Sequence, residues 1–514
     1  MVGGDGIKNR CHRTDDREKE AQPKMRRRDF LQMAATFVGA AMGGSYFAKE
    51  YLVPLMENDL PVPALPTGLV PQPVMFPAKT QDVSWNLLIH NGKIVDGLGV
   101  PAYEGAIAIK GDRIEAVVKA EAETRLEKGL YINGNQRYRL PEQCQIIDAA
   151  GGCITPGFVD IHTHNEDYLK ANPIAGVRLF QGITSQIGGN CGDSVDNIKD
   201  FRNQLGSLGV NYGQLVGYLN LRRQVLGGDV DRKASPKEID QMRNLLLRGL
   251  GEGATGMSVA LEYTPQYSMT KEELKQYAQA LKSKKALLAV HLRSESQYLL
   301  EAVDEILEVA RATGVSVQIS HVKALLSENW SKFPKILDKI RQAAESGLDV
   351  WGDMYVYDYP SWDFGSTQVF ISEDNIALGL AHPRIFIASD AGLYENGGAG
   401  HPRAYGNYPR VISRYVRQNG VLTLEKAIAK MTSMPATRLG LRDRGRLTAG
   451  AKADVIVFDY ERFRDLARKE HPDLLPEGMK HVFVNGVQVI DGGKLTGKRP
   501  GEWLKGEGIE HALL

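Results

Sequence analysis

Cysteine is scarce in this 514-residue sequence, and neither sign of charge is in excess. The four cysteines, Cys11, Cys144, Cys153 and Cys191, are too few and too scattered for a disulfide framework. Cys144 and Cys153 would pair only in an exported protein, and buried free thiols are the favoured interpretation. Lys plus Arg (63) balance Asp plus Glu (62), giving a net charge of +1. No global field would attract nucleic acid or an acidic membrane, so a small-molecule partner is expected.

The sequence also has few long apolar runs. One candidate for a signal or membrane segment lies near the amino terminus. Arg26-Arg27-Arg28-Asp29-Phe30-Leu31 precedes an Ala- and Gly-rich run over residues 33–48. This pattern resembles a twin-arginine export signal, so residues 1–48 are expected to be a leader and the protein to be periplasmic or on the cell surface. The run is short for a span of about 20 residues, but an uncleaved membrane tether through residues 31–48 stays open. Met25 is an alternative start, because residues 1–24 are polar and charged.

The segments on either side of the middle of the chain predict one small β domain. Residues 49–84 are rich in proline and are expected to be an extended linker. Short alternating runs at residues 87–95 and 105–109 predict strands within residues 85–153. Similar runs at residues 453–458 and 481–486 predict a second part over residues 441–514. Both ends of the chain are therefore expected to build one composite β-sandwich.

Residues 154–440 alternate apolar strand runs with amphipathic helices such as residues 271–284, 298–313 and 332–346. The expected strands end near His162, Gly189, Leu219, Leu261, His291, Ser320, Tyr355 and Ser389. Eight such βα units are what a TIM (β/α)8 barrel requires. The sequence therefore predicts an α/β fold, with the barrel inserted into the β-sandwich.

Histidines stand at the ends of three of these strands, where a TIM barrel places its active site. Asp160, His162 and His164 alternate along the first strand, so the two-residue period points them to one side. His291 and His321 end the fifth and sixth strands, 30 residues apart, which is about one βα unit. This repeated placement favours metal ligands over solvated or hydrogen-bonded histidines.

A glycine-rich turn at the end of the second strand carries a candidate thiolate ligand, Cys191. A phosphate-binding loop is the alternative for this turn, but no Gly-Lys-Ser/Thr follows it. Imidazole nitrogens, a thiolate and an open coordination position together suit zinc. Asp390 lies at the end of the eighth strand. An isolated aspartate there would usually be a helix cap or a turn residue, but the candidate metal ligands beside it favour the role of a general base.

Two cations follow the histidines of the fifth and sixth strands. Arg293 and Lys323 each lie two positions after a histidine, so the alternation directs both toward the mouth of the barrel. Such a mouth suits an anionic substrate. The alternative is that both cations pair with carboxylates on the rim.

These residues together predict a metal-dependent hydrolase that cleaves a linear amide. Zinc would lower the pKa of its bound water toward about 7 and polarise the scissile carbonyl. Asp390 would take the proton from the water and deliver it to the departing nitrogen, because an amide anion is a very poor leaving group.

Over residues 85–505 the sequence resembles the D-aminoacylase (N-acyl-D-amino-acid deacylase) branch of the amidohydrolase superfamily. The matching stretches are Pro156-Gly157-Phe158-Val159-Asp160-Ile161-His162-Thr163-His164, Gly189-Asn190-Cys191-Gly192, Gly256-Met257-Ser258-Val259-Ala260-Leu261-Glu262-Tyr263, His291-Leu292-Arg293-Ser294-Glu295, Gln318-Ile319-Ser320-His321-Val322-Lys323, Ser389-Asp390 and His401-Pro402-Arg403-Ala404-Tyr405-Gly406. The Asn-Cys-Gly motif is the discriminating one.

The resemblance implies a role for each site residue. Cys191, His291 and His321 would hold a tight zinc, and His162 and His164 a weaker second ion that shares Cys191. Asp390 matches the catalytic aspartate of the family. The matches to substrate-contacting positions are Tyr263, Lys323 and Tyr355.

One departure from the family pattern leaves the exact substrate open. Relatives carry a long insertion between the seventh-strand Tyr and the eighth-strand Asp, which supplies a lid and an arginine for the substrate carboxylate. Here only 35 positions separate Tyr355 from Asp390. Arg293, Lys323 or Arg403 would have to substitute, or a larger substrate binds an open mouth. The leading hypothesis is an N-acyl-D-amino-acid deacylase, and the alternatives are a hydrolase of cyclic amides or unusual dipeptides and a non-catalytic barrel scaffold.

Overall fold

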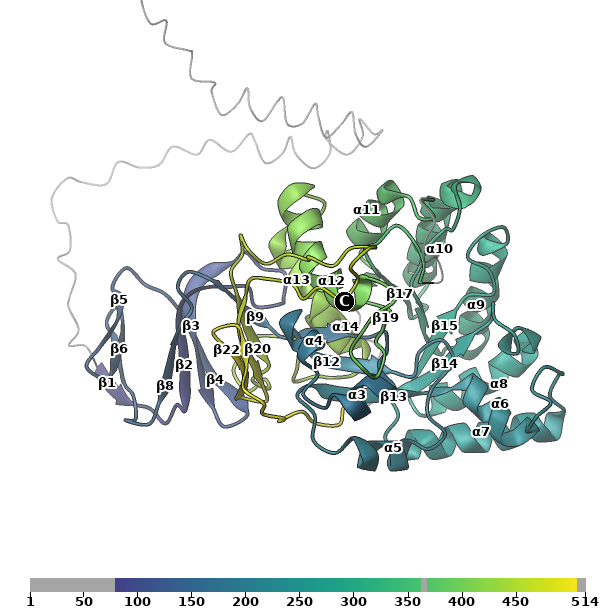
Figure 1. Ribbon diagram of the computed structural model, residues 1–514, viewed down its shortest axis with the longest axis horizontal. Coiled ribbons are helices and arrows are strands. Elements are labelled where there is room, and N and C mark those ends of the chain that lie inside the picture. The colour runs from purple at the N-terminus through teal and green to yellow at the C-terminus, as the bar shows by residue number, and fades with distance from the viewer. Residues whose placement is uncertain (1–78, 362–367, 506–514) are drawn as a thin grey trace, which may run out of the picture. The chain divides into compact units, whose positions relative to one another are not determined.

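The computed structural model describes residues 79–361 and 368–505 (Figure 1). The predicted leader and most of the predicted linker lie outside the described residues. The last part of that linker differs from the prediction, because Lys79–Asp82 form strand β1, which pairs in parallel with β7 (Gln136–Arg139). Within the described part of the chain, no helix has both the length and the apolar character needed to cross a membrane.

Eight parallel strands form the predicted TIM barrel, and each pairs with the next one in the sequence. These strands are β10 (Phe158–Asp160), β12 (Ile183–Gly188), β13 (Asn211–Gly217), β14 (Gly256–Ala260), β15 (Leu287–His291), β16 (Ser316–Ile319), β17 (Val350–Met354) and β18 (Ile385–Ile387). Every residue in them is buried, as expected for strands covered on both faces. Beyond the ends of the first and last strands, β11 (Thr163–His164) pairs with β19 (Ala391–Gly392). This pairing joins the two ends of the sheet, and the predicted fold class is confirmed.

Helices lie around the barrel (Figure 1). They are α3 (Glu166–Ala171), α4 (Gly176–Phe180), α5 (Ile198–Leu205), α6 (Tyr218–Leu226), α7 (Pro236–Gly251), α8 (Lys271–Ser283), α9 (Leu299–Thr313), α10 (Phe333–Glu345), α11 (Glu373–Ala381), α12 (Arg403–Arg410), α13 (Leu424–Met431) and α14 (Ser433–Arg438). Capping residues set where two of these helices begin: Ser235 caps α7 in a capping box with Glu238, and Thr270 caps α8. Short helical turns are η1 (Gln266–Ser268) and η2 (Ser327–Lys332), and α12 continues into a π-helix, η3 (Val411–Gln418).

The second domain is a composite of both chain ends, as predicted. Its larger sheet runs in the order β23-β22-β21-β20-β9-β2-β3-β4, with β8 also paired to β2. The strands are β2 (Leu87–Ile94), β3 (Tyr103–Lys110), β4 (Arg113–Lys119), β8 (Gln145–Asp148), β9 (Cys153–Pro156), β20 (Val455–Phe458), β21 (Met479–Val484), β22 (Val487–Asp491) and β23 (Lys494–Leu495). A smaller sheet, β1-β7-β6-β5, includes β5 (Thr124–Glu127) and β6 (Leu130–Asn133).

Strand β9 is where the two chain ends meet. It lies between β2, to which it is parallel, and β20, to which it is antiparallel. Ile154 of β9 shares a buried cluster with Ile89 of β2 and Val455 of β20. The sheet therefore extends through Pro156, three residues beyond the predicted boundary at residue 153. Cys144 and Cys153 are free and buried, which agrees with the favoured interpretation of both thiols.

Candidate active site

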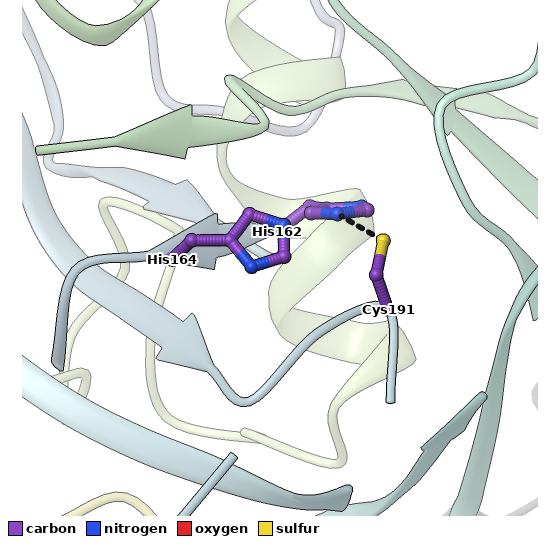
Figure 2. A group of neighbouring side chains, drawn as sticks. All are labelled: His162, His164 and Cys191. Atoms are coloured by element: carbon purple, nitrogen blue, oxygen red, sulfur yellow. Dashed lines mark hydrogen bonds between the residues drawn. The ribbon is translucent and has the colours of Figure 1, made fainter. Parts of the chain in front are cut away.

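A cluster of imidazoles surrounds one thiol at the carboxyl ends of the barrel strands. The Sγ atom of Cys191 lies 3.5 Å from His162 Nε2, 3.4 Å from His321 Nε2 and 3.9 Å from His291 Nδ1. Figure 2 shows His162 and His164 beside this cysteine, and the donor atoms of these three residues all lie within 4.8 Å of one another. Strands from opposite parts of the barrel thus converge on Cys191 with donor atoms that bind metal ions.

The turn after β12 needs its glycines to present Cys191. Cys191 itself has a positive φ of 52°, and Gly192 follows with a φ of 76°. A Cβ at Gly192 would collide with the side chain of Gln266, whose Nε2 donates to the Cys191 carbonyl at 3.1 Å. The glycine therefore permits the close approach of Gln266, which fixes the backbone that carries the thiol.

The cluster favours the thiolate form of Cys191. Burial raises the pKa of this thiol, but the charges and hydrogen bonds of His162 and His321 outweigh burial and hold the pKa well below its usual value. Burial likewise lowers the pKa of His164, and its bonds to Asp390 and Cys191 reverse this and raise the pKa to about 10. The thiolate is the form of cysteine that ligates metals.

Asp390 faces the same cluster from the other side. It follows β18 with a positive φ of 50°. Its Oδ1 lies 3.2 Å from His164 Nε2 and 3.4 Å from His162 Nε2, and its Oδ2 lies 2.8 Å from Arg403 Nη1. Burial raises the pKa of Asp390, but Arg403 and the histidines outweigh burial and hold it well below the ordinary range. Asp390 is therefore a carboxylate that contacts both predicted ligands of the second ion.

Three carboxylates that the sequence did not single out orient the histidine rings. Asp353 Oδ1 lies 3.2 Å from His162 Nδ1 and accepts from the His321 backbone N–H at 2.8 Å. Glu295 Oε1 lies 2.8 Å from His321 Nδ1. Glu262 Oε2 lies 3.0 Å from His291 Nε2. Such partners fix which ring nitrogen is available to a metal. Asp353 could have been found from the two-residue alternation, because it lies on β17 two positions before Tyr355, which follows the strand, whereas the two glutamates lie beyond the ends of their strands.

Asp160 belongs to a different group from the histidines that follow it. It pairs with Arg178, and both side chains are fully buried. The Oδ1 of Asp160 also accepts the backbone N–H of Ser389 at 3.0 Å. Arg178 donates from Nη1 to the Ala404 carbonyl at 3.2 Å. This pair therefore holds the backbone next to Asp390 and Arg403 and does not itself face the metal cluster.

The two cations predicted at the mouth take different positions. Arg293 turns away from the cluster: it pairs with Glu305 at 2.9 Å and donates to the carbonyls of Tyr267 and Met269. This is the rim pairing that the sequence left open. Lys323 is buried, and its Nζ lies 2.6 Å from Glu295 Oε1 and 5.8 Å from the ring centre of Tyr355. Lys323 is thus paired but remains within the site.

A cavity of about 450 Å³ opens over the cluster. Besides the candidate metal ligands, its lining includes Tyr263, Leu393, Tyr394, His401 and Arg403. The Arg403 guanidinium stacks on Tyr355 at 4.5 Å. The Oη of Tyr355 and the Nε of Arg403 are buried and have no hydrogen-bond partner among the described residues. These unpaired donors beside Asp390 are suited to an anionic group of a bound substrate.

Residues 153–489 match the sequence pattern of the Amidohydrolase family. The chain belongs to this family. The amidohydrolase is 32% identical over 499 residues to N-acyl-D-glutamate deacylase of Alcaligenes xylosoxydans xylosoxydans, a match covering 82% of this chain and 96% of that protein. It is 28% identical over 496 residues to the D-aminoacylase of the same organism, over 82% and 97% of the two chains.

Solved structures of similar proteins agree with this placement. N-acyl-D-glutamate deacylase from Bordetella bronchiseptica, in complex with zinc and a phosphonate inhibitor, has a TM-score of 0.72 and 26% identity over 82% of this chain and all of its own. A D-aminoacylase structure has a TM-score of 0.73 at the same identity and coverage. An L-hydantoinase from Arthrobacter aurescens, at 17% identity and a TM-score of 0.59, shares the fold. The predicted resemblance is confirmed: the amidohydrolase belongs with the N-acyl-D-amino-acid deacylases, hydrolases of carbon–nitrogen bonds.

Proposed function

We propose that this amidohydrolase cleaves the amide bond of N-acyl-D-amino acids with the help of zinc. The observation that carries the proposal is the thiolate of Cys191 among three imidazoles, facing Asp390 and Arg403 across one cavity. The relatives named as deacylases of N-acyl-D-glutamate and as D-aminoacylase support this choice of substrate.

The donor set of Cys191, His291 and His321 fits zinc. In a tetrahedral zinc site, Zn–S of about 2.3 Å and Zn–N of about 2.0–2.1 Å place sulfur and nitrogen about 3.6 Å apart. The measured separations from Cys191 Sγ are 3.4 Å to His321 and 3.9 Å to His291. We propose these three residues as ligands of the tight ion, and His162 and His164 with Cys191 as a weaker second site.

The residues of this chain have two further roles, proton transfer and substrate binding. When bound, zinc acts as a Lewis acid that polarises the scissile carbonyl and makes water acidic enough to attack it. Asp390 is placed to accept the proton of the attacking water and to return it to the departing nitrogen. Its contact with Arg403 keeps it ionised and therefore able to act as a base.

Arg403, Lys323 and Tyr355 are the proposed site for the substrate's α-carboxylate. They lie together, with Arg403 at 4.5 Å and Lys323 at 5.8 Å from the Tyr355 ring centre. Tyr355 Oη and Arg403 Nε have no protein partner among the described residues, and a carboxylate would accept from both. Arg403 is therefore the cation that we propose in place of the arginine of the missing insertion.

The test combines metal content with a substrate panel. Purified protein is dialysed, its zinc is measured by mass spectrometry, and N-acetyl-D-amino acids, their L-enantiomers and hydantoins are assayed. We expect at least one retained zinc per chain and turnover of the D-series. Cys191→Ala should lose metal and activity together, whereas Cys153→Ala, which removes a buried thiol outside the site, should lose neither. Metal-independent activity, or turnover of hydantoins alone, would refute the proposal.

Export remains a separate proposal that rests on the twin-arginine-like pattern. A functional signal predicts that changing Arg27 and Arg28 together to Lys leaves the protein in the cytoplasm, while the parent chain reaches the periplasm or cell surface. Immunoblots of cell fractions measure this, and resistance of the exported protein to salt extraction would indicate a tether through residues 31–48.

A further inference from the structure

The cavity offers positive charge for one carboxylate. Among the described residues in and behind its wall, the Lys and Arg side chains are Arg403 and Lys323. Each already faces an acidic partner, because Arg403 Nη1 lies 2.8 Å from Asp390 and Lys323 Nζ lies 2.6 Å from Glu295. Lys323 Nζ also lies 2.8 Å from His321 Nδ1 and donates to the His321 carbonyl at 3.2 Å, so the α-carboxylate of an N-acyl amino acid would take up the unpaired Nε of Arg403.

The rest of the described wall carries no Lys or Arg. It includes Ser361, Leu393 and Tyr394, together with Tyr263, whose ring packs on His291 at 4.6 Å. Arg293, the other cation expected at the mouth, is held by Glu305 and two backbone carbonyls. The connection from β17 to β18 has no Lys or Arg over residues 355–383, and Arg384, at its end, stands over the ring of Trp351 near the start of β17 at 4.2 Å.

The surface next to the cavity is acidic. A second cavity, of about 630 Å³, shares His164 and Leu393 with the first. Its acidic lining residues are Glu166, Asp167, Asp193, Asp196 and Asp200. Its two cations are committed within this group, with Lys170 at 3.1 Å from Asp167 and Arg223 at 3.3 Å from Asp193. This excess of negative charge would repel an acidic substrate side chain that extends toward it.

One further cation lies beyond the wall and belongs in the test. The Lys469 ammonium stands over the ring of Tyr359 at 4.5 Å, and that ring packs on His401 at 4.4 Å. Lys469 is not among the residues that line the cavity. It is nevertheless an alternative source of positive charge on the His401 side.

We propose that this amidohydrolase selects N-acyl amino acids with an uncharged side chain and discriminates against N-acyl-D-glutamate and N-acyl-D-aspartate. The inference rests on the proposed deacylase function. A second carboxylate would meet no Lys or Arg side chain in this wall and would face the acidic residues of the adjoining cavity. The proposal departs from the substrate named for the 32% identical relative, which is acidic.

The experiment compares kcat/KM of the zinc-loaded enzyme for N-acetyl derivatives of D-leucine, D-methionine and D-phenylalanine with those of D-glutamate and D-aspartate. We expect the neutral substrates to be preferred by about 100-fold or more, mainly through KM. Tyr394→Arg adds a cation to an exposed position of the wall and should shift the ratio toward D-glutamate by at least tenfold. Its matched neutral control, Tyr394→Gln, should leave the ratio unchanged.

The possible results separate the two proposals. Equal or better turnover of D-glutamate would overturn the selectivity and leave the deacylase function standing. If Lys469→Gln then abolished D-glutamate turnover, the overlooked cation would be Lys469. Turnover of none of the N-acetyl-D-amino acids by the zinc-loaded enzyme would refute the proposed function and the selectivity together.

Discussion

Replacing Arg178 with Met should destabilise the barrel and slow catalysis at a distance. The Arg178 guanidinium and the Asp160 carboxylate are fully buried and paired, and Arg178 Nη2 also donates to Ser389 Oγ at 3.2 Å. Removing one partner of a buried pair leaves an uncompensated charge, which costs about 3–5 kcal/mol. The double variant Asp160→Asn/Arg178→Met carries no such charge, so it should be more stable than Arg178→Met alone.

The same substitution should lower kcat more than it raises KM. Ser389 precedes Asp390, and Ala404, whose carbonyl accepts from Arg178, follows Arg403. Arg178 therefore anchors the backbone beside the proposed base and the proposed carboxylate ligand. Arg222→Met is the matched control, because Arg222 is equally buried but bonds to Tyr218 and backbone carbonyls outside the site.

Urea unfolding of Arg178→Met and of Asp160→Asn/Arg178→Met measures the stabilities, and steady-state kinetics on the best N-acetyl-D-amino acid measures the activity. The reasoning fails if Arg178→Met costs less than about 1 kcal/mol, or if the double variant is no more stable than the single one. Equal losses of kcat in Arg178→Met and Arg222→Met would show that the effect on activity is general destabilisation.

Further predictions concern the base, the cysteine turn and pH. Asp390→Asn should lower kcat by about a hundredfold or more while zinc content, measured by mass spectrometry, stays unchanged; full activity would remove Asp390 from the mechanism. Gly192→Ala should reduce zinc retention after dialysis, because the new methyl group displaces Gln266 from the Cys191 backbone; normal retention would contradict this. Burial lowers the pKa of Lys430 to about 7. Between pH 7 and about 10.4 the Lys430 amine is therefore protonated in the unfolded chain and neutral in the folded chain. The free energy of unfolding should rise with pH in that window by up to about 1.4 kcal/mol per pH unit. Urea unfolding at pH 7, 8 and 9 should show this rise in the parent and a smaller one in Lys430→Met, and identical slopes would count against it.

The barrel could be predicted because its signals are local. Apolar strand runs and amphipathic helices recur along residues 154–440, and each expected strand end lies within two residues of the observed one. Strand β1 escaped prediction since its sequence, Lys79-Thr80-Gln81-Asp82, is polar throughout and is ordered by pairing with β7. These four residues form a strand because they pair with β7, and their own sequence does not indicate one.

The site shows a similar limit. His162, Cys191, His291 and His321 were expected together because a barrel brings strand ends to one face, and the structure places them so. The predicted direction of the Arg293 side chain was wrong because β15 ends at His291, and the two-residue alternation does not continue beyond a strand. Glu262 and Glu295 meet the histidines only through tertiary contacts, so no spacing in the sequence reveals them. The catalytic and binding roles of the site residues remain predictions.

Strand β9 gives the protein a definite order of assembly. It stands in the middle of its sheet and needs β20, which lies about 300 residues further along the chain. During synthesis the amino-terminal strands therefore have an open, aggregation-prone edge until residues 455–458 have emerged from the ribosome. Completion of this sheet is a late event that follows translation of the whole barrel.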